Sequence, residues 1–135
     1  MKKHLLMLAI ASSCFVATQA GAMTQDEYKV AKEKVEAGYK VDKAKCDAMK
    51  DNAKDICQKE AKGKENVAKA ELEQQYKPSD GHMKKVAEEK VKATYDVAKE
   101  KCDDQKGDAK NACEKEAKAE EARGKADIKA MTAKK

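Results

Sequence analysis

Four cysteines in the body of the chain are the residues whose type and spacing could do chemistry. They stand in two stretches of one pattern, CDAMKDNAKDIC and CDDQKGDAKNAC, with ten residues between Cys46 and Cys57 and ten between Cys102 and Cys113. A thiol can bind a soft metal ion, exchange electrons or close a disulfide. The surrounding sequence therefore has to distinguish a metal site, a redox site and structural disulfides.

The redox and metal interpretations find little support. A redox dithiol usually has C-x-x-C spacing and a neighbour that lowers the pKa of one thiol, and neither stretch offers this. The four cysteines also lack the short C-x2–4-C spacing that is typical of structural zinc sites. His82-Met83 pairs an imidazole with a thioether, the ligands that copper accepts, but the chain has only two histidines. We expect no metal, no cofactor and no catalytic residue.

The N-terminus indicates export. Residues 1–22, MKKHLLMLAIASSCFVATQAGA, begin with Lys2 and Lys3, continue with a short apolar run and end in small residues. This order is typical of a secretory signal peptide, with cleavage expected after Ala22. The alternative, lipid attachment at Cys14, requires a large aliphatic residue three positions earlier, where the chain has alanine.

Composition narrows the classes of function. Cleavage would lower the net charge from +5 to +3, because Lys2 and Lys3 are the only charged residues removed. With 41% charged residues, 4% aromatics and no tryptophan, the chain is poorly suited to enclose a catalytic cavity, so we predict a non-enzymatic protein.

The same composition bears on binding partners and location. Acidic residues alternate with the lysines, which argues against nucleic-acid binding. No later apolar stretch approaches a membrane span, so no stable membrane insertion is expected after cleavage. An exported chain with four remaining cysteines favours disulfides and a periplasmic or secreted location.

The chain is built from two copies of one unit. Residues 29–79 align without a gap with residues 85–135, and 24 of the 51 aligned positions are identical. The copies share a tyrosine, several valines and both cysteines. The stretch between them contains Pro78, which cannot continue a helix, so that Ser79 or Asp80 would cap the next one. We predict repeat 1 at 23–77, a linker at 78–83 and repeat 2 at 84–135.

Each copy has the composition of a helix. Alanine, lysine and glutamate are strong helix formers, and acid-to-lysine pairs recur at four-residue spacing. Larger side chains recur every eleven residues, as from Tyr28 to Tyr39 and from Val30 to Val41. Eleven residues make almost three turns, so these side chains share a face. We interpret this stripe as ordinary helix packing of the coiled-coil kind.

A break divides each copy into two helices. Asp51-Asn52 in the first copy corresponds to Gly107-Asp108 in the second. Glycine or aspartate can adopt the left-handed conformation that ends a helix, and asparagine or aspartate can cap the next helix. The expected class is all-α, with two disulfide-clamped helical hairpins in tandem and a small Ala-rich core. The four predicted helices are 25–50, 53–76, 84–106 and 109–131.

Two disulfide arrangements fit this pattern. If each copy turns at its break, Cys46 meets Cys57 and Cys102 meets Cys113 on facing helices. If each copy is one unbroken helix, its two cysteines lie about 16 Å apart. They would then pair as Cys46–Cys113 and Cys57–Cys102 across a turn at PSDG, which resembles the twin C-x9-C and C-x10-C hairpins. We favour the local pairing, because Asp-Asn and Gly-Asp are costly inside a helix and a duplicated unit should be self-sufficient.

The segments YKVDKAKCDAMKDNAKDICQKEAKGKENVAKAELEQQYKPS and YDVAKEKCDDQKGDAKNACEKEAKAEEARGKAD resemble a group of small exported proteobacterial proteins with a Lys/Ala-rich duplicated repeat. These are uncharacterised and often labelled "cell envelope biogenesis protein TolA". The resemblance implies a periplasmic helical repeat with a structural or interaction role in the cell envelope. Its partners would be envelope proteins or further copies of the chain. VAKEKVEAGYK and DVAKEKCDDQK are also similar to late-embryogenesis-abundant-like hydrophilins, which implies the alternative of a stress protectant for envelope proteins or membranes.

Overall fold

The structure, a computed structural model, describes residues 23–133. The predicted signal peptide at 1–22 and Cys14 lie outside the described residues. The described chain is entirely helical, without strands, and the prediction of an all-α protein with four helices is confirmed. The helices are α1 (Gln25–Asp47), α2 (Asp51–Tyr76), α3 (Asp80–Cys102) and α4 (Gly107–Ala133).

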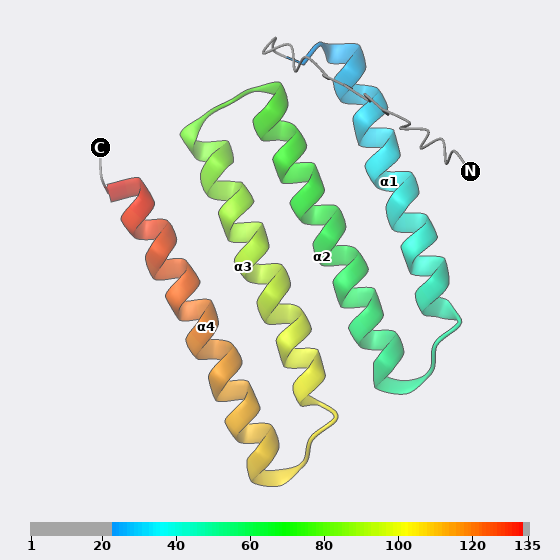
Figure 1. Cartoon of the computed structure of the whole chain (residues 1–135), viewed down its shortest axis with the longest axis vertical. Helices are drawn as coiled ribbons and strands as arrows, with labels where there is room; N and C mark the ends of the chain where they lie inside the picture. Colours follow the sequence, from blue (N-terminus) through cyan, green and yellow to red (C-terminus); the bar gives the residue numbers. More distant parts are fainter. Residues whose placement is uncertain (1–22, 134–135) are drawn as a thin grey trace, which may run out of the picture.

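The four helices lie side by side in a single layer (Figure 1). Successive helices run antiparallel, and within the described residues α1 contacts α2, α2 contacts α3 and α3 contacts α4, with no other helix pair in contact. A layer one helix thick cannot enclose a core, so each contact between neighbours must be stable by itself. Both faces of the layer stay open, and α1 and α4 form its two outer edges.

Side chains at the helix starts explain where the helices begin. The Thr24 hydroxyl accepts a hydrogen bond from the Glu27 backbone N–H at 3.3 Å, while the Glu27 carboxylate accepts one from the Thr24 N–H at 2.8 Å. This reciprocal capping box starts α1. Ser79 caps α3 by accepting from the His82 N–H at 3.0 Å. Ser79 follows Pro78 directly and already caps α3. The connection between α2 and α3, residues 77–79, is therefore shorter than the predicted linker at 78–83.

The turn within each hairpin comes earlier than the sequence indicated. We predicted first helices ending at 50 and 106, but α1 ends at Asp47 and α3 at Cys102. Asp51 and Gly107 do adopt left-handed backbone, with φ of 52° and 58°, but they begin the second helix of each hairpin rather than ending the first. The connections occupy residues 48–50 and 103–106, where backbone hydrogen bonds from the Met49 N–H to the Cys46 carbonyl and from the Gln105 N–H to the Cys102 carbonyl close the last turns of α1 and α3.

The core is small and rich in alanine, as predicted. The buried apolar residues among those described are Cys46, Ala61, Ala70, Leu72, Cys102, Ala117 and Ile128. Within residues 23–133, Cys46 and Cys102 alone have fully buried side chains. No helix in the described part of the chain has both the length and the apolar composition needed to cross a bilayer.

The eleven-residue stripe divides between two environments. Val35 and Cys46 lie on the side of α1 that faces α2, in accord with ordinary helix packing. Val30 and Val41 are 51% and 56% exposed. The stripe is therefore wider than a single contact can cover, and part of it lies at the outer edge of the layer.

Candidate functional site

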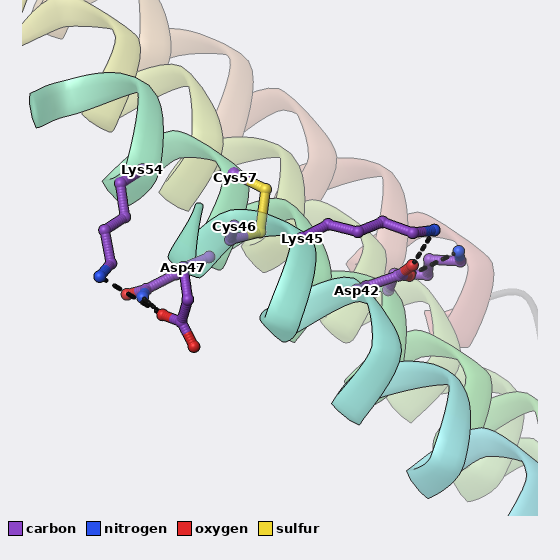
Figure 2. The surroundings of a disulfide bond; sticks show 8 residues. Asp42, Lys45, Cys46, Asp47, Lys54 and Cys57 are labelled. Carbon is purple, nitrogen blue, oxygen red and sulfur yellow. Dashed lines mark hydrogen bonds and ion pairs between the residues drawn. A yellow bond between two sulfur atoms is a disulfide. The ribbon is translucent and has the colours of Figure 1, made fainter. Parts of the chain in front are cut away.

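The two disulfides close the hairpins locally, as predicted. Cys46 is bonded to Cys57 and Cys102 to Cys113, with Cα atoms 5.4 and 5.6 Å apart. Figure 2 shows the first bond joining the end of α1 to the start of α2. The alternative pairing across the layer is not present. All four predicted cysteines are thus placed, in pairs, at equivalent ends of the two hairpins.

Each disulfide is accompanied by the same ion pair. Lys54 reaches back across the first turn to Asp47 at 3.4 Å, as Figure 2 shows. The equivalent pair in the second hairpin joins Lys110 to Asp103 at 2.7 Å. The hydrogen bond from Lys110 lowers the pKa of the Asp103 carboxyl below its ordinary value. Disulfide, left-handed residue and ion pair together form one turn unit that occurs twice.

This geometry suits a structural disulfide. A catalytic disulfide exposes a sulfur to a substrate thiolate, whereas here one cysteine of each bond, Cys46 or Cys102, is fully buried and the other, Cys57 or Cys113, is half-buried. Among residues 23–133, no group of three or more His, Cys, Asp and Glu side chains could hold a metal ion. The absence of catalytic activity stays a prediction.

His82 and Met83, considered above as copper ligands, have other surroundings. The Nδ1 atom of His82 donates to the carbonyl oxygen of Lys77 at 2.6 Å, which fastens the connection between α2 and α3. Met83 is exposed. The imidazole therefore takes part in the turn, next to the Ser79 cap.

A second candidate site, absent from the sequence-based predictions, is a pair of shallow grooves that we call the hairpin grooves. Groove 1 lies between α1 and α2 and has a volume of about 280 Å³. Groove 2 lies between α3 and α4 and has a volume of about 300 Å³. Groove 1 is lined by Lys34, Val35, Gly38, Tyr39, Asp42, Ala61, Lys64, Glu65 and Ala68. Groove 2 is lined by Lys90, Val91, Thr94, Tyr95, Ala98, Ala117, Glu120 and Glu121.

The two hairpin grooves are equivalent under the repeat. Each lining residue of groove 2 is the counterpart, 56 positions later, of a lining residue of groove 1. Five of these positions carry the same residue in both copies: Lys34/Lys90, Val35/Val91, Tyr39/Tyr95, Ala61/Ala117 and Glu65/Glu121. Because α1 and α3 run in the same direction, as do α2 and α4, both grooves open on the same face of the layer. The identity of these positions between the copies was the sequence signal that could have revealed them.

The grooves combine an apolar wall with charges of both signs. In groove 1, Lys64 donates to Asp42 at 2.9 Å, and this hydrogen bond lowers the pKa of the Asp42 carboxyl. The ammonium of Lys62 lies 5.1 Å from the centroid of the Tyr39 ring, within the range of a cation–π contact. A partner segment with an apolar side chain flanked by charged or polar groups would match this lining.

Glu65 is the one buried charged residue of the described chain, with 6% of its surface exposed. Its carboxylate accepts from Lys62 at 2.8 Å and from Lys69 at 2.7 Å. Burial opposes ionisation of Glu65, but the two ammonium groups outweigh it, so the pKa lies below the ordinary 4.5. A carboxyl whose pKa is lowered by folding stabilises the fold above its unfolded pKa and loses this effect as the pH falls through the folded pKa.

We therefore expect Glu65→Gln to lower the free energy of unfolding by roughly 1–2 kcal/mol at pH 7, because two lysines lose a charged partner. The difference between variant and wild type should shrink as the pH falls below the ordinary value of 4.5 and through the lowered pKa of Glu65. Chemical denaturation followed by circular dichroism between pH 7 and pH 3 measures it. The matched control is Glu121→Gln, since that side chain is 24% exposed and pairs with Lys125 alone at 2.6 Å. A pH-independent difference for Glu65→Gln, or an equal effect of both variants, would contradict the assignment.

No protein-family model, no curated protein sequence and no solved structure matches this chain.

Proposed function

We propose that the chain is a non-enzymatic, exported helical repeat protein that binds partner proteins of the cell envelope through its two hairpin grooves. The observation that carries the proposal is the repetition of one groove, with five identical lining positions, on one face of an open helical layer. Two similar sites on a disulfide-bonded scaffold favour a partner with two related segments, because the second contact then forms at a high effective concentration.

Several features support the exported location in this proposal. The N-terminal sequence has the order of a secretory signal, and both pairs of cysteines are oxidised. Disulfides persist in oxidising compartments, of which the periplasm is the one that the resemblance implies. The two disulfides also suit a protein whose helices do not enclose a core, because they stabilise each hairpin directly.

We expect paired substitution of Tyr39 and Tyr95 by alanine to abolish partner binding, and each single substitution to weaken it. The reason is that each half-buried ring forms the wall of one groove. Wild type and the three variants, immobilised without reductant, are used to capture proteins from an envelope extract, which are identified by mass spectrometry. A genuine partner is retained by wild type, reduced by either single variant and lost with the double variant.

Tyr28→Ala is the matched control. Tyr28 also belongs to α1, but its ring stacks on Tyr76 at a centroid distance of 4.5 Å, outside both grooves. Retention of the partner by Tyr28→Ala and its loss from the double variant would locate binding in the grooves. A protein captured equally by all variants would argue against the grooves as its site.

The alternative is a stress protectant of the hydrophilin kind, favoured by the 41% of charged residues. A protectant acts on many clients and needs no defined groove, so tyrosine substitution should leave protection of a test enzyme during drying unchanged. Circular dichroism adds a second criterion: a cooperative, disulfide-dependent melt supports the binding module. Little helix in dilute buffer and much helix on drying would support the protectant.

A further inference from the structure

The outer edge of α1 is an apolar stripe without a neighbouring helix. We call the stripe Val30, Ala37, Val41 and Ala44 the α1 edge. All four residues are exposed, and the valines are 51% and 56% exposed. Their spacing of seven, four and three residues keeps them on one side of the helix, opposite the side that carries Val35 and Cys46.

The same stripe recurs in α3, where it is covered. Val86, Ala93 and Val97 are the counterparts of Val30, Ala37 and Val41, and all three are half-buried. They lie on the side of α3 that packs on α2, because a Cβ atom built on Gly63 of α2 would lie only 2.7 Å from the Ala93 Cβ. The interface between α2 and α3 thus shows what the α1 edge is shaped to contact, namely a helix like α2.

The helix equivalent to α2 is α4, whose outer side is also uncovered. The residues of α2 on the α3 side include Ile56, Gly63, Val67 and Ala70, and their counterparts in α4 are Ala112, Ala119, Arg123 and Ala126. These four α4 residues, which we call the α4 edge, are exposed. The α4 edge keeps one alanine unchanged but lacks the close approach that Gly63 allows.

If the α4 edge packed on the α1 edge as α2 packs on α3, some of the facing charges would be of opposite sign. Two ion pairs across the α2–α3 interface join Lys90 to Glu71 at 2.7 Å and Lys101 to Glu60 at 3.5 Å. Their counterparts at the edges are Lys34 with Asp127 and Lys45 with Glu116, both of opposite sign.

Other pairs of the interface do not carry over. Lys85 pairs with Glu73 at 2.9 Å, but the counterparts Lys29 and Lys129 have the same sign. Lys59 pairs with Glu100 at 4.0 Å, but the counterpart of Glu100 is the uncharged Ala44. The edges therefore match only in part of their shape, because Ala119 stands where α2 has Gly63, and in part of their charge, which predicts a weak contact.

We propose that the protein associates with further copies of itself head to tail, with the α4 edge of one copy packed on the α1 edge of the next. The contact repeats, between molecules, the packing of α2 on α3 within one molecule. It is heterologous, because two different surfaces meet, and it does not close on itself. A contact of one helix with one helix is small, so the association is weak and reversible. It uses the edges of the layer and shares only Lys34 with the lining of groove 1, so it can be tested separately from the proposed binding function.

Sedimentation velocity and equilibrium on residues 23–135, over a concentration series without reductant, test the proposal. The average mass should rise with concentration through dimer and beyond, without a plateau at two copies. Val41→Glu places a charge in the centre of the contact and should weaken association about tenfold or more. Lys43→Glu, an exposed change on α1 away from the edge, is the control and should change association less than twofold.

A gain-of-association variant excludes misfolding as the explanation. The triple substitution Ala119→Gly, Arg123→Val and Lys129→Glu gives α4 three of the residues that α2 presents to α3, namely those at Gly63, Val67 and Glu73. We expect it to strengthen association at least tenfold relative to wild type.

Glu116→Lys distinguishes the proposed contact from a two-fold pairing of two α1 edges. It removes a favourable charge from the head-to-tail contact alone, so it should weaken association, and adding Lys45→Glu should restore it. A mass that stops at two copies and ignores Glu116→Lys would overturn the proposal. A strict monomer at every concentration, for wild type and triple variant alike, would also overturn it.

Discussion

Removal of the first disulfide, by replacing Cys46 and Cys57 with alanine, is expected to lower the free energy of unfolding by about 3 kcal/mol. A crosslink stabilises mainly by restricting the unfolded chain, and a loop of this size gives that magnitude in the chain-entropy model. This loss is a large part of the total free energy of unfolding, because a layer one helix thick with an alanine-rich core buries little apolar surface. Replacing Cys102 and Cys113 should have a similar effect, since the two turn units are equivalent.

Reduction of both disulfides should therefore unfold most of the helical structure at room temperature. Urea denaturation followed by ellipticity at 222 nm, with and without reductant, measures the loss. A control for the reductant itself is the chain with all four cysteines replaced by alanine, whose stability should not depend on redox state. An unchanged denaturation midpoint after reduction would contradict a stabilising role for the clamps.

The local pairing can be checked chemically on the same sample. Lys50 and Lys54 separate Cys46 from Cys57, and Lys106 and Lys110 separate the other two cysteines. A non-reducing tryptic digest should yield one linked peptide pair from each hairpin. A peptide pair that links Cys46 to Cys113 would contradict the structure.

The second large effect is expected at Gly63, where the two hairpins meet. A Cβ atom at this position would lie 2.7 Å from the Ala93 Cβ and 3.4 Å from its Cα. Neither atom can move without shifting the α3 backbone. We therefore expect Gly63→Ala to push α2 and α3 apart and to cost roughly 1–3 kcal/mol, despite the better helix propensity of alanine.

Gly38 is the matched control, since a Cβ atom there would meet nothing within 4 Å. Gly38→Ala should stabilise the chain by about 0.5–1 kcal/mol through helix propensity alone. The double variant Gly63→Ala, Ala93→Gly should recover part of the lost stability, because it moves the methyl group from α3 to α2. Denaturant titration of the four chains measures these differences. Equal stabilisation by Gly38→Ala and Gly63→Ala would contradict the close approach of the two hairpins.

Much of the fold follows from local features of the sequence. The helix breaks at Pro78 and near Asp51 and Gly107 were predictable, because these residues act on their own backbone. The favoured pairing of Cys46 with Cys57 followed from the break between them. The end of α1 was not predictable to the residue, since residues 48–50, which form the turn before the left-handed Asp51, include no proline or glycine that marks the end of a helix.

The candidate binding site was harder to predict from the sequence. Tyr39 and Val35 stood out as members of the apolar stripe, but their place in a groove depends on which α2 residues face them. Glu65 looked like one of many solvated acids. Its pairing with Lys62 and Lys69 is local to α2, but its burial arises only when α2 packs against α1.

The sequence by itself determined the helices, their breaks, the duplication and the local closure of each hairpin, because short-range interactions decide all of these. Only the tertiary structure decided that the hairpins extend in a row instead of folding into a bundle. The row shows in the contacts of the described residues: α2 meets α3 closely at Gly63 and Ala93, thirty positions apart, while α1 does not meet α4. The same choice leaves Val30 and Val41 uncovered and opens both grooves on one face, so the surfaces available for binding follow from packing that no local pattern encodes.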